Sequence, residues 1–164
     1  MMQRDNIKID DMQYHEIPYI AEIEKRCFSI CAWTENMFRS MFDDADHENI
    51  MLTAYADGMI AGYIAMQLCA DEAEIMVIAV DEPFRRRGIA DMLIDYAEKK
   101  LTENTVKILL EVRENNIAAQ KLYYKKGFEK TGLRKNYYRD FSGKPPENAV
   151  LMTKYLKTEM FEKC

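Results

Sequence analysis

Residues 80–90 carry the pattern that decides the fold: Val80-Asp81-Glu82-Pro83-Phe84-Arg85-Arg86-Arg87-Gly88-Ile89-Ala90. An apolar stretch ends at Val80, and apolar residues at helical spacing begin after Gly88. The segment therefore predicts a strand, a short turn and the start of a helix. Backbone N–H groups at a helix start lack helical partners and favour an anion, and a glycine lets the backbone approach it closely. Residues 85–90 are thus a candidate phosphate-binding turn, although an arginine-rich surface before an ordinary helix explains the same residues.

Two other phosphate-binding patterns are absent from the sequence. There is no Gly-x-x-x-x-Gly-Lys-Ser/Thr segment and no Gly-x-Gly-x-x-Gly segment. Nucleotide hydrolases and dinucleotide-dependent dehydrogenases are therefore disfavoured.

Outward from this turn, hydrophobic periodicity and turn residues predict eleven elements. In chain order they are a strand at 7–9, helices at 16–28 and after the N-cap Thr34, a hairpin of strands 50–56 and 59–69 around Asp57-Gly58, a strand at 73–80, a helix at 88–102, a strand at 106–112, a helix at 116–126 ended by Gly127, and strands at 128–138 and 149–156. The order is β-α-α-β-β-β-α-β-α-β-β. A strand, helix and strand in the middle imply a parallel pair, and the flanking hairpins imply a mixed sheet. We expect one α/β domain over residues 1–164, a mixed twisted β-sheet flanked by helices.

The apolar patterns also predict which side chains face the core. The second helix is expected to bury Met37, Phe38, Met41 and Phe42, and the helix at 88–102 is expected to bury Ile89, Met92, Leu93, Tyr96 and Ala97. The run Ile108-Leu109-Leu110 predicts a strand that is buried on both faces.

Composition narrows the class of protein. The chain has 164 residues, 48% of them hydrophobic, and a net charge of −5, which suits one globular domain and does not favour DNA as a partner. Charge is uneven, because residues 1–57 hold twelve acids and five bases whereas residues 121–144 hold eight bases and two acids. The polar N-terminus and the lack of a long apolar run predict a cytoplasmic protein with no membrane partner.

The sequence offers few metal ligands. Its two histidines are His15 and His47, and its four cysteines, Cys27, Cys31, Cys69 and Cys164, show no zinc-ligand spacing. We therefore expect no metal.

The second half of the chain carries a longer motif: Leu110-Glu111-Val112-Arg113-Glu114-Asn115-Asn116-Ile117-Ala118-Ala119, then Leu122-Tyr123, then Gly127-Phe128. It resembles the segment Glu-Val-Arg-x-x-Asn-x-x-Ala-x-x-Leu-Tyr-x-x-x-Gly-Phe of the GCN5-related N-acetyltransferase (GNAT) family. The Arg-x-x-Gly-x-Ala pattern at 85–90 is similar to the acetyl-CoA pyrophosphate loop of that family. The order of elements agrees over nearly the whole chain. The resemblance implies a GNAT domain that uses acetyl-CoA and releases CoA.

Within the family, two further segments resemble the members that acetylate ribosomal proteins: Ile78-Ala79-Val80-Asp81 and Arg134-Lys135-Asn136-Tyr137-Tyr138. This resemblance implies direct attack, in a ternary complex, by the N-terminal α-amine of a protein. The implied acceptor is the N-terminal alanine of small-subunit ribosomal protein eighteen. Acceptance of lysine or a small amine, and a non-catalytic acetyl-CoA-binding regulatory module, remain alternatives. Two departures are Ala32, where proline is usual, and Asp91, where a basic residue is common.

The resemblance also implies roles for single residues. Glu111 would accept the amine proton, through water, and Tyr123 would donate a proton or hydrogen bond to the CoA sulfur. A salt bridge from Glu111 to Arg113 and a purely structural Tyr123 are the alternatives. Asn116 would hydrogen-bond the cofactor arm, cap a helix, or do both.

The remaining implied ligand contacts fall into two sets. The cofactor would be bound by the backbone of Ile78, Ala79 and Val80 and by the loop residues Arg85, Arg86, Arg87, Gly88, Ile89, Ala90 and Asp91. The acceptor peptide would be bound by Trp33, Tyr137 and Tyr138.

The energetics of the acceptor favour an α-amine. Neutralising an N-terminal amine at pH 7 costs about 1 kcal/mol, whereas neutralising a lysine costs about 4.6 kcal/mol. A single carboxylate is better suited to the smaller task.

Overall fold

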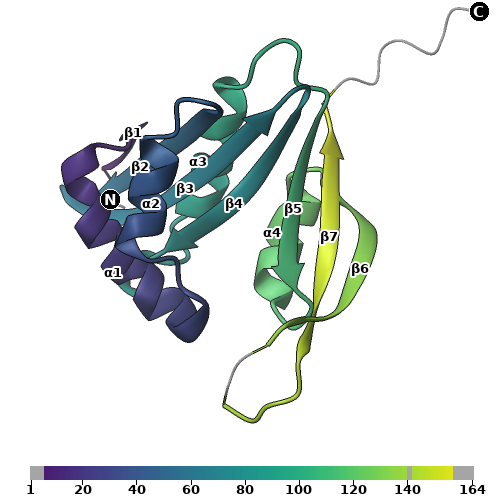
Figure 1. The fold of residues 1–164 in the computed structure, drawn as a ribbon. Coiled ribbons are helices and arrows are strands. Elements are labelled where there is room, and N and C mark those ends of the chain that lie inside the picture. The colour runs from purple at the N-terminus through teal and green to yellow at the C-terminus, as the bar shows by residue number, and fades with distance from the viewer. Residues whose placement is uncertain (1–5, 140–141, 157–164) are drawn as a thin grey trace, which may run out of the picture. The chain divides into compact units, whose positions relative to one another are not determined.

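The protein is described by a computed structural model over residues 6–139 and 142–156, whose elements are labelled in Figure 1. Its internal contacts divide the chain into two units. The first comprises Met1–Leu68 and Met76–Leu101, and the second comprises Cys69–Ile75 and Thr102–Cys164. Strand β4 (Glu72–Val80) contributes residues to both.

The first unit is built on antiparallel strands covered by helices. Its elements are β1 (Ile7–Asp11), α1 (Ile17–Phe28), α2 (Glu35–Phe42), β2 (Glu48–Ala56), β3 (Met59–Cys69), the later part of β4, and α3 (Ile89–Lys99), with short 3₁₀ turns at Tyr14–Glu16, Ser29–Cys31 and Glu82–Phe84. Strand β2 pairs antiparallel with both β1 and β3. Most residues of β2 and β3 are buried, because α1 and α2 cover one face and α3 covers the other (Figure 1).

Local signals in this unit act as the sequence predicts. The hairpin turn has positive φ at both central residues, 53° at Asp57 and 80° at Gly58, as a type I′ turn requires. The Thr34 side chain accepts a hydrogen bond of 3.3 Å from the Met37 N–H and so caps α2. Both predictions are confirmed.

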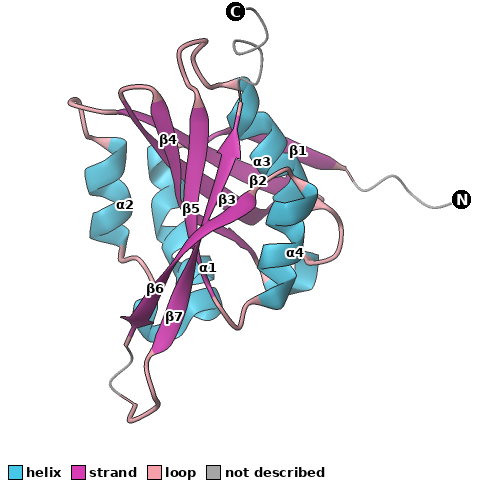
Figure 2. Ribbon diagram, turned by 90° about the vertical axis from the view of Figure 1, so that its right-hand side faces the viewer, coloured by secondary structure: helices cyan, strands magenta, loops and turns pink. Residues whose placement is uncertain are grey.

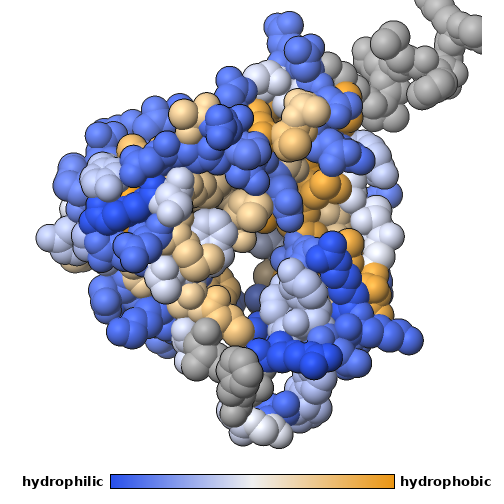
Figure 3. Space-filling view, viewed as in Figure 1, coloured by the Kyte–Doolittle hydropathy of each residue, from blue (hydrophilic) through white to orange (hydrophobic). Residues whose placement is uncertain are grey.

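The second unit contains the first residues of β4, β5 (Lys107–Arg113), α4 (Ile117–Lys125), β6 (Glu129–Tyr138) and β7 (Glu147–Tyr155). Strand β5 runs parallel to β4, from Lys107 opposite Glu72 to Leu110 opposite Ile75. On its other side β5 is antiparallel to β7, which in turn pairs with β6. Helix α4 lies along one face of these strands (Figure 2). The side chains of β6 are almost all exposed, and hydrophilic residues gather over the lower part of the strands of this unit in Figure 3.

The strand order is β1-β2-β3-β4-β5-β7-β6. It includes both parallel and antiparallel neighbours, so the predicted mixed sheet and the predicted order of the eleven elements are confirmed. Among the described residues, no helix is long and apolar enough to cross a membrane.

The prediction that the strand at 106–112 is buried on both faces is wrong. Ile108, Leu110 and Val112 are buried, but Leu109 and Glu111 are only half-buried. Although three consecutive residues are apolar, the side chains of this strand alternate between a buried face and a half-buried face, as in an ordinary strand. As a result, Glu111 stands on the more accessible face of β5.

Four core predictions on helices are also wrong, because the buried stripes are narrower than the apolar patterns. On α2 only Phe38 and Met41 are buried, whereas Met37 and Phe42 are exposed. On α3, Tyr96 is exposed and Met92 is only half-buried, whereas Ile94 is buried.

Gly62 lies where the backbones of β3 and β4 approach each other closely. A methyl group there would lie 2.6 Å from the Ala79 carbonyl oxygen and 3.3 Å from the Val80 Cα, both backbone atoms that cannot rotate away. Gly62→Ala should lower the free energy of unfolding by about 1–3 kcal/mol in urea denaturation. The control is Gly132→Ala, whose methyl would meet only the Leu151 side chain, at 3.7 to 3.9 Å. Equal loss of stability in both variants would contradict this account.

Candidate active site

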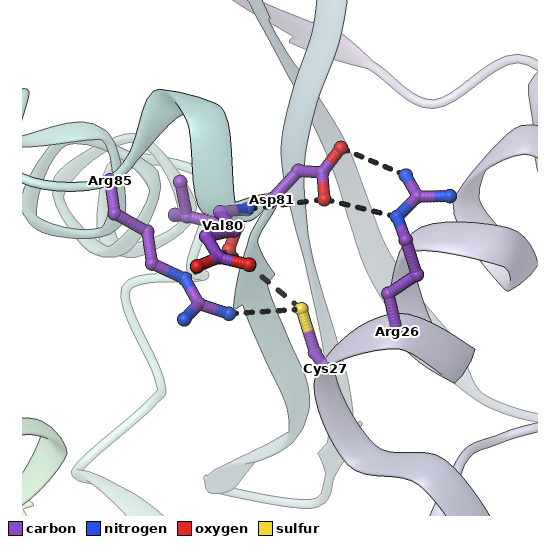
Figure 4. A network of polar contacts seen from close by, with 6 residues as sticks. Arg26, Cys27, Val80, Asp81 and Arg85 are labelled. Carbon is purple, nitrogen blue, oxygen red and sulfur yellow. Dashed lines mark hydrogen bonds and ion pairs between the residues drawn. The ribbon is translucent and has the colours of Figure 1, made fainter.

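The end of β4 is fixed by contacts from α1 (Figure 4). The Val80 carbonyl accepts a hydrogen bond of 3.0 Å from Arg85 Nε and a longer one, of 3.8 Å, from Cys27 Sγ. Arg85 Nη2 also lies 3.5 Å from the same sulfur. Burial raises the pKa of the Cys27 thiol, so the thiol is protonated at neutral pH and serves here as a hydrogen-bonding group.

Asp81, the next residue, is held from two sides. Its carboxylate accepts two bonds from Arg26, of 3.2 Å from Nε and 2.8 Å from Nη2, and its N–H donates to the Ala61 carbonyl at 2.8 Å. The Arg26 side chain is more than half exposed, so the ion pair adds at most about 1 kcal/mol to stability. Its main effect is to fix where the chain leaves the strand.

The turn that follows has a left-handed backbone at two positions. φ is 66° at Arg86 and 75° at Gly88, and the first hydrogen bond of α3 runs from the Met92 N–H to the Gly88 carbonyl. No atom lies within 4 Å of a Cβ built on Gly88, so glycine is favoured there by φ and the space beside it is open. When residues just before a helix have a left-handed backbone, their successive N–H groups point to one side. This geometry suits phosphate oxygens.

The three arginines of the turn differ in their contacts. Arg85 bonds to Val80 and Cys27, as above, and Arg87 forms a 3.0 Å ion pair with Asp57. Arg86 is exposed. Asp91 lies in the first turn of α3 and is half-buried.

Glu111, on β5, forms its ion pair with Arg134 and not with Arg113, the partner considered from the sequence. Arg134 Nη1 lies 2.7 Å from Glu111 Oε1, while Arg113 pairs with Glu147 at 2.9 Å. The Glu111 side chain is 19% exposed, so it keeps access to solvent. On the adjacent β4, the pKa of Glu74 is raised by burial and by the Glu111 charge, which places two carboxylates near the same arginine.

Tyr123 is fixed by the end of α4. The Gly127 N–H donates to the Tyr124 carbonyl and the Phe128 N–H to the Tyr123 carbonyl, both at 3.0 Å, which is the Schellman pattern. The Phe128 ring packs 5.7 Å from the Tyr123 ring. Burial raises the pKa of Tyr123, with a smaller effect from Tyr138. Within residues 6–139 and 142–156, the Tyr123 hydroxyl has no hydrogen-bond partner.

Tyr137 and Tyr138 end β6 beyond an irregularity at Asn136, where φ is 56°. Their rings meet edge-on at 5.1 Å. Tyr138 packs under the Arg113 guanidinium, and burial, followed by the Glu111 charge, raises its pKa to about 12. Tyr137 is exposed, with the Arg134 guanidinium 5.3 Å from its ring centre.

The remaining predicted residues are placed as follows. Asn116 caps α4, since its Oδ1 accepts 3.2 Å from the Ala119 N–H, which confirms the capping alternative. Ile78, Ala79 and Val80 are the last residues of β4, and only Ala79 is buried. Trp33 is half-buried between α1 and α2.

The first unit therefore holds Trp33 and the predicted residues of 78–91, and the second holds Glu111, Asn116, Tyr123, Tyr137 and Tyr138. The sequence alone missed the contacts of Arg26 and Cys27, which join residues more than fifty positions apart, and the ion pair of Arg134. Within the described ranges no group of three potential ligand side chains could hold a metal ion. Cys27 and Cys69 are free thiols, and Cys164 lies outside the described residues.

Comparison with known proteins identifies the class. The pattern of the Acetyltransferase (GNAT) family matches residues 17–128. The chain belongs to this family of acetyl-CoA-dependent N-acyltransferases, and the predicted enzyme class is confirmed.

Particular relatives carry a narrower description. The chain is 35% identical over 138 residues to the [ribosomal protein bS18]-alanine N-acetyltransferase of Salmonella typhimurium, covering 84% of this chain and 89% of that protein. It is 32% identical over 145 residues to the Escherichia coli K12 protein of the same description, covering 88% and 94%. A crystal structure of the E. coli ribosomal-protein-S18-alanine N-acetyltransferase superposes with a TM-score of 0.79 at 27% identity, covering 96% and 99%. The predicted resemblance to that subgroup is confirmed.

The isolated hydroxyl of Tyr123 leads to a stability prediction. Because it bonds to no described protein group, Tyr123→Phe should change the free energy of unfolding by no more than about 0.5 kcal/mol. Tyr63→Phe is the matched comparison, since the buried Tyr63 hydroxyl donates to the Glu24 carboxylate. It should cost about 1.5–3 kcal/mol. Urea denaturation of both variants checks the difference, and a large loss in Tyr123→Phe would contradict it.

Proposed function

We propose that this protein transfers the acetyl group of acetyl-CoA to the N-terminal alanine of ribosomal protein bS18. One observation supports the chemistry: the second unit contains both a carboxylate anchored by an arginine, Glu111, and a buried phenol that has no described partner, Tyr123. The acceptor rests on the relatives at 32 to 35% identity that bear this description.

The loop residues of the first unit fit the phosphates of acetyl-CoA. The N–H groups of residues 86–90 and the side chain of Arg86 would hold the pyrophosphate, with Arg85 and Arg87 bracing the turn. The backbone of residues 78–80 would pair with the amides of the pantetheine arm. In the second unit, Asn116 is proposed to hydrogen-bond the cofactor. When bound, acetyl-CoA supplies the acetyl group as an activated thioester.

Glu111 acts as the proton acceptor in this proposal. The amine nitrogen forms a bond to the acetyl carbon, the bond from that carbon to sulfur breaks, and the amine proton passes through water to Glu111. Arg134 fixes the carboxylate on its other side. A lone carboxylate is adequate because an α-amine costs only about 1 kcal/mol to neutralise at pH 7.

Tyr123 completes the proton balance by donating its phenolic proton to the departing thiolate. Its raised pKa keeps the phenol protonated until a strong base forms beside it. No cysteine is needed as an intermediate carrier, so the amine attacks the thioester directly.

The acceptor peptide would be bound by Trp33, Tyr137 and Tyr138. Two of these rings are partly exposed and stacked by arginines, an arrangement that suits a flexible peptide. We place the reaction in the cytoplasm, where ribosomal proteins are made, and assign residues 1–164 to one acetyltransferase domain.

The acceptor is tested by initial rates of CoA release with a panel of substrates. Ribosomal-protein peptides with a free N-terminal Ala, Ser or Met are compared with an N-terminally blocked peptide that contains lysine, and with a polyamine. Turnover should be greatest with N-terminal alanine and absent with the blocked peptide. Preference for the blocked peptide or the polyamine would overturn the acceptor, and tight CoA binding without turnover would indicate a regulatory module.

The proposed chemistry predicts that Glu111→Gln and Tyr123→Phe each lower kcat by about 10²–10⁴-fold, as expected for the loss of a proton acceptor or donor. Binding of CoA, measured by calorimetry, should change little. Tyr124→Phe, an exposed neighbour on α4, is the control and should retain full activity. Normal kcat in either of the first two variants would contradict its assigned role.

The pyrophosphate loop predicts a separate effect on the cofactor. Arg86→Ala should raise KM for acetyl-CoA by about tenfold, the loss of one charge-assisted hydrogen bond, with kcat nearly unchanged. Lys99→Ala, at the other end of α3, is the control for loss of a positive charge. An equal effect of the two substitutions would argue against specific binding at the loop.

A further inference from the structure

We infer that Glu24, together with Tyr63, is a positioning residue for the acceptor: it fixes the segment between α1 and α2 that carries Trp33. This inference rests on the proposed peptide-binding role of Trp33. Glu24 itself touches neither substrate in this account. It acts by holding the backbone to which Trp33 belongs.

The Glu24 carboxylate is buried and uses both oxygens. Glu24 is 1% exposed, its Oε1 accepts 2.9 Å from the Trp33 N–H, and its Oε2 accepts from the Tyr63 hydroxyl. Burial raises the pKa of Glu24, and the two hydrogen bonds oppose that rise. Burying a carboxylate is unfavourable unless it is hydrogen-bonded, so the Trp33 amide is part of what makes this buried acid tolerable.

The segment between α1 and α2, which Glu24 holds, begins with an unfavourable backbone conformation. At Ser29, directly after α1, φ is 53° and ψ is −118°, a conformation that a residue with a Cβ rarely adopts. Such conformations persist only where surrounding contacts determine them. Four residues later the Glu24–Trp33 bond supplies such a contact, and Thr34 then begins α2.

Ring contacts also connect Trp33 to Tyr63, the tyrosine that donates to Glu24. The Trp33 ring lies 5.4 Å from Phe38, and Phe38 packs edge-on against Tyr63 at 5.6 Å. Trp33 is thus fixed through its backbone by Glu24 and through its side chain by Phe38. Both paths end on Tyr63, a wholly buried residue of β3.

The same unit contains a matched acid that does not reach the segment. Glu16 is 4% exposed and accepts hydrogen bonds from the Tyr55 hydroxyl, the Thr53 hydroxyl and the Gln13 N–H. It therefore has the burial and the tyrosine of Glu24 without a bond to Trp33. Substitution of Glu16 separates a general loss of stability from a specific effect on the acceptor.

The kinetic test compares Glu24→Leu with Glu16→Leu on an N-terminal alanine peptide, because a leucine side chain cannot accept the Trp33 N–H. Glu24→Leu should raise KM for the peptide by about tenfold, with kcat and KM for acetyl-CoA within about twofold of wild type. Tyr63→Phe leaves the Trp33 bond in place and should shift KM in the same direction but less. Glu16→Leu should leave all three constants near wild type. Equal KM in the two leucine variants would overturn the inference.

A second readout does not depend on turnover. Trp33 is the only tryptophan in the chain, so its fluorescence reports directly on this segment. Acrylamide should quench Trp33 more strongly in Glu24→Leu than in wild type, and equally in Glu16→Leu and wild type. Unchanged quenching in Glu24→Leu would overturn the inference, whether or not the wild-type protein acetylates a peptide. A wild-type protein that acetylates no peptide would overturn the proposed function instead. Increased quenching without a change in peptide KM would also overturn it.

Discussion

The ion pair between Arg134 and Glu111 organises the polar side chains of the second unit. It reaches from β6 across β7 to β5, so it connects the edge strand that bears the tyrosine pair to the strand that bears the acid. The guanidinium also stacks on Tyr137. β6 is almost wholly exposed, and little apolar burial fixes its end. A single arginine therefore orients both the carboxylate and the aromatic residues beside it.

In the first unit, the last turns of α1 orient the neighbouring segments. Arg26 holds Asp81, Cys27 meets the Val80 carbonyl, and Glu24 holds the Trp33 amide. One helix thereby fixes the exit of β4 and the entry to α2. These are the segments to which we assign cofactor and acceptor binding. The individual bonds are modest in energy, but they fix backbone groups, whose placement decides what a ligand can contact.

Much of this fold could be predicted from local signals. The Asp57-Gly58 turn, the Thr34 cap, the Gly127 helix end and the parallel β4–β5 pair all follow from residue chemistry at short range. The motif around Glu111 and Tyr123 indicated the family, and the element order agreed with it. The burial of single side chains was less predictable. Leu109, Met37 and Tyr96 have apolar side chains at apolar spacing, yet the neighbouring elements do not cover them completely.

The partners of the charged residues could not be predicted. Glu111 has Arg113 two residues away on the same strand, but its ion pair is with Arg134, because the strand pairing of β5, β7 and β6 brings that side chain across. The acid Glu24 lies four residues after Ile20, on the apolar face of α1, but the sequence does not show which groups would hydrogen-bond to a carboxylate there. Its burial depends on Tyr63, thirty-nine residues further along the chain.

The central claim is that the acetyl group goes to an N-terminal α-amine. The most direct test is fragmentation mass spectrometry of one ribosomal-protein bS18 peptide, with a free N-terminal alanine and an internal lysine, after incubation with the protein and acetyl-CoA. The account predicts acetylation on the alanine nitrogen alone, lost with Glu111→Gln. Acetylation on the lysine, or on neither nitrogen while the protein binds CoA, would contradict it.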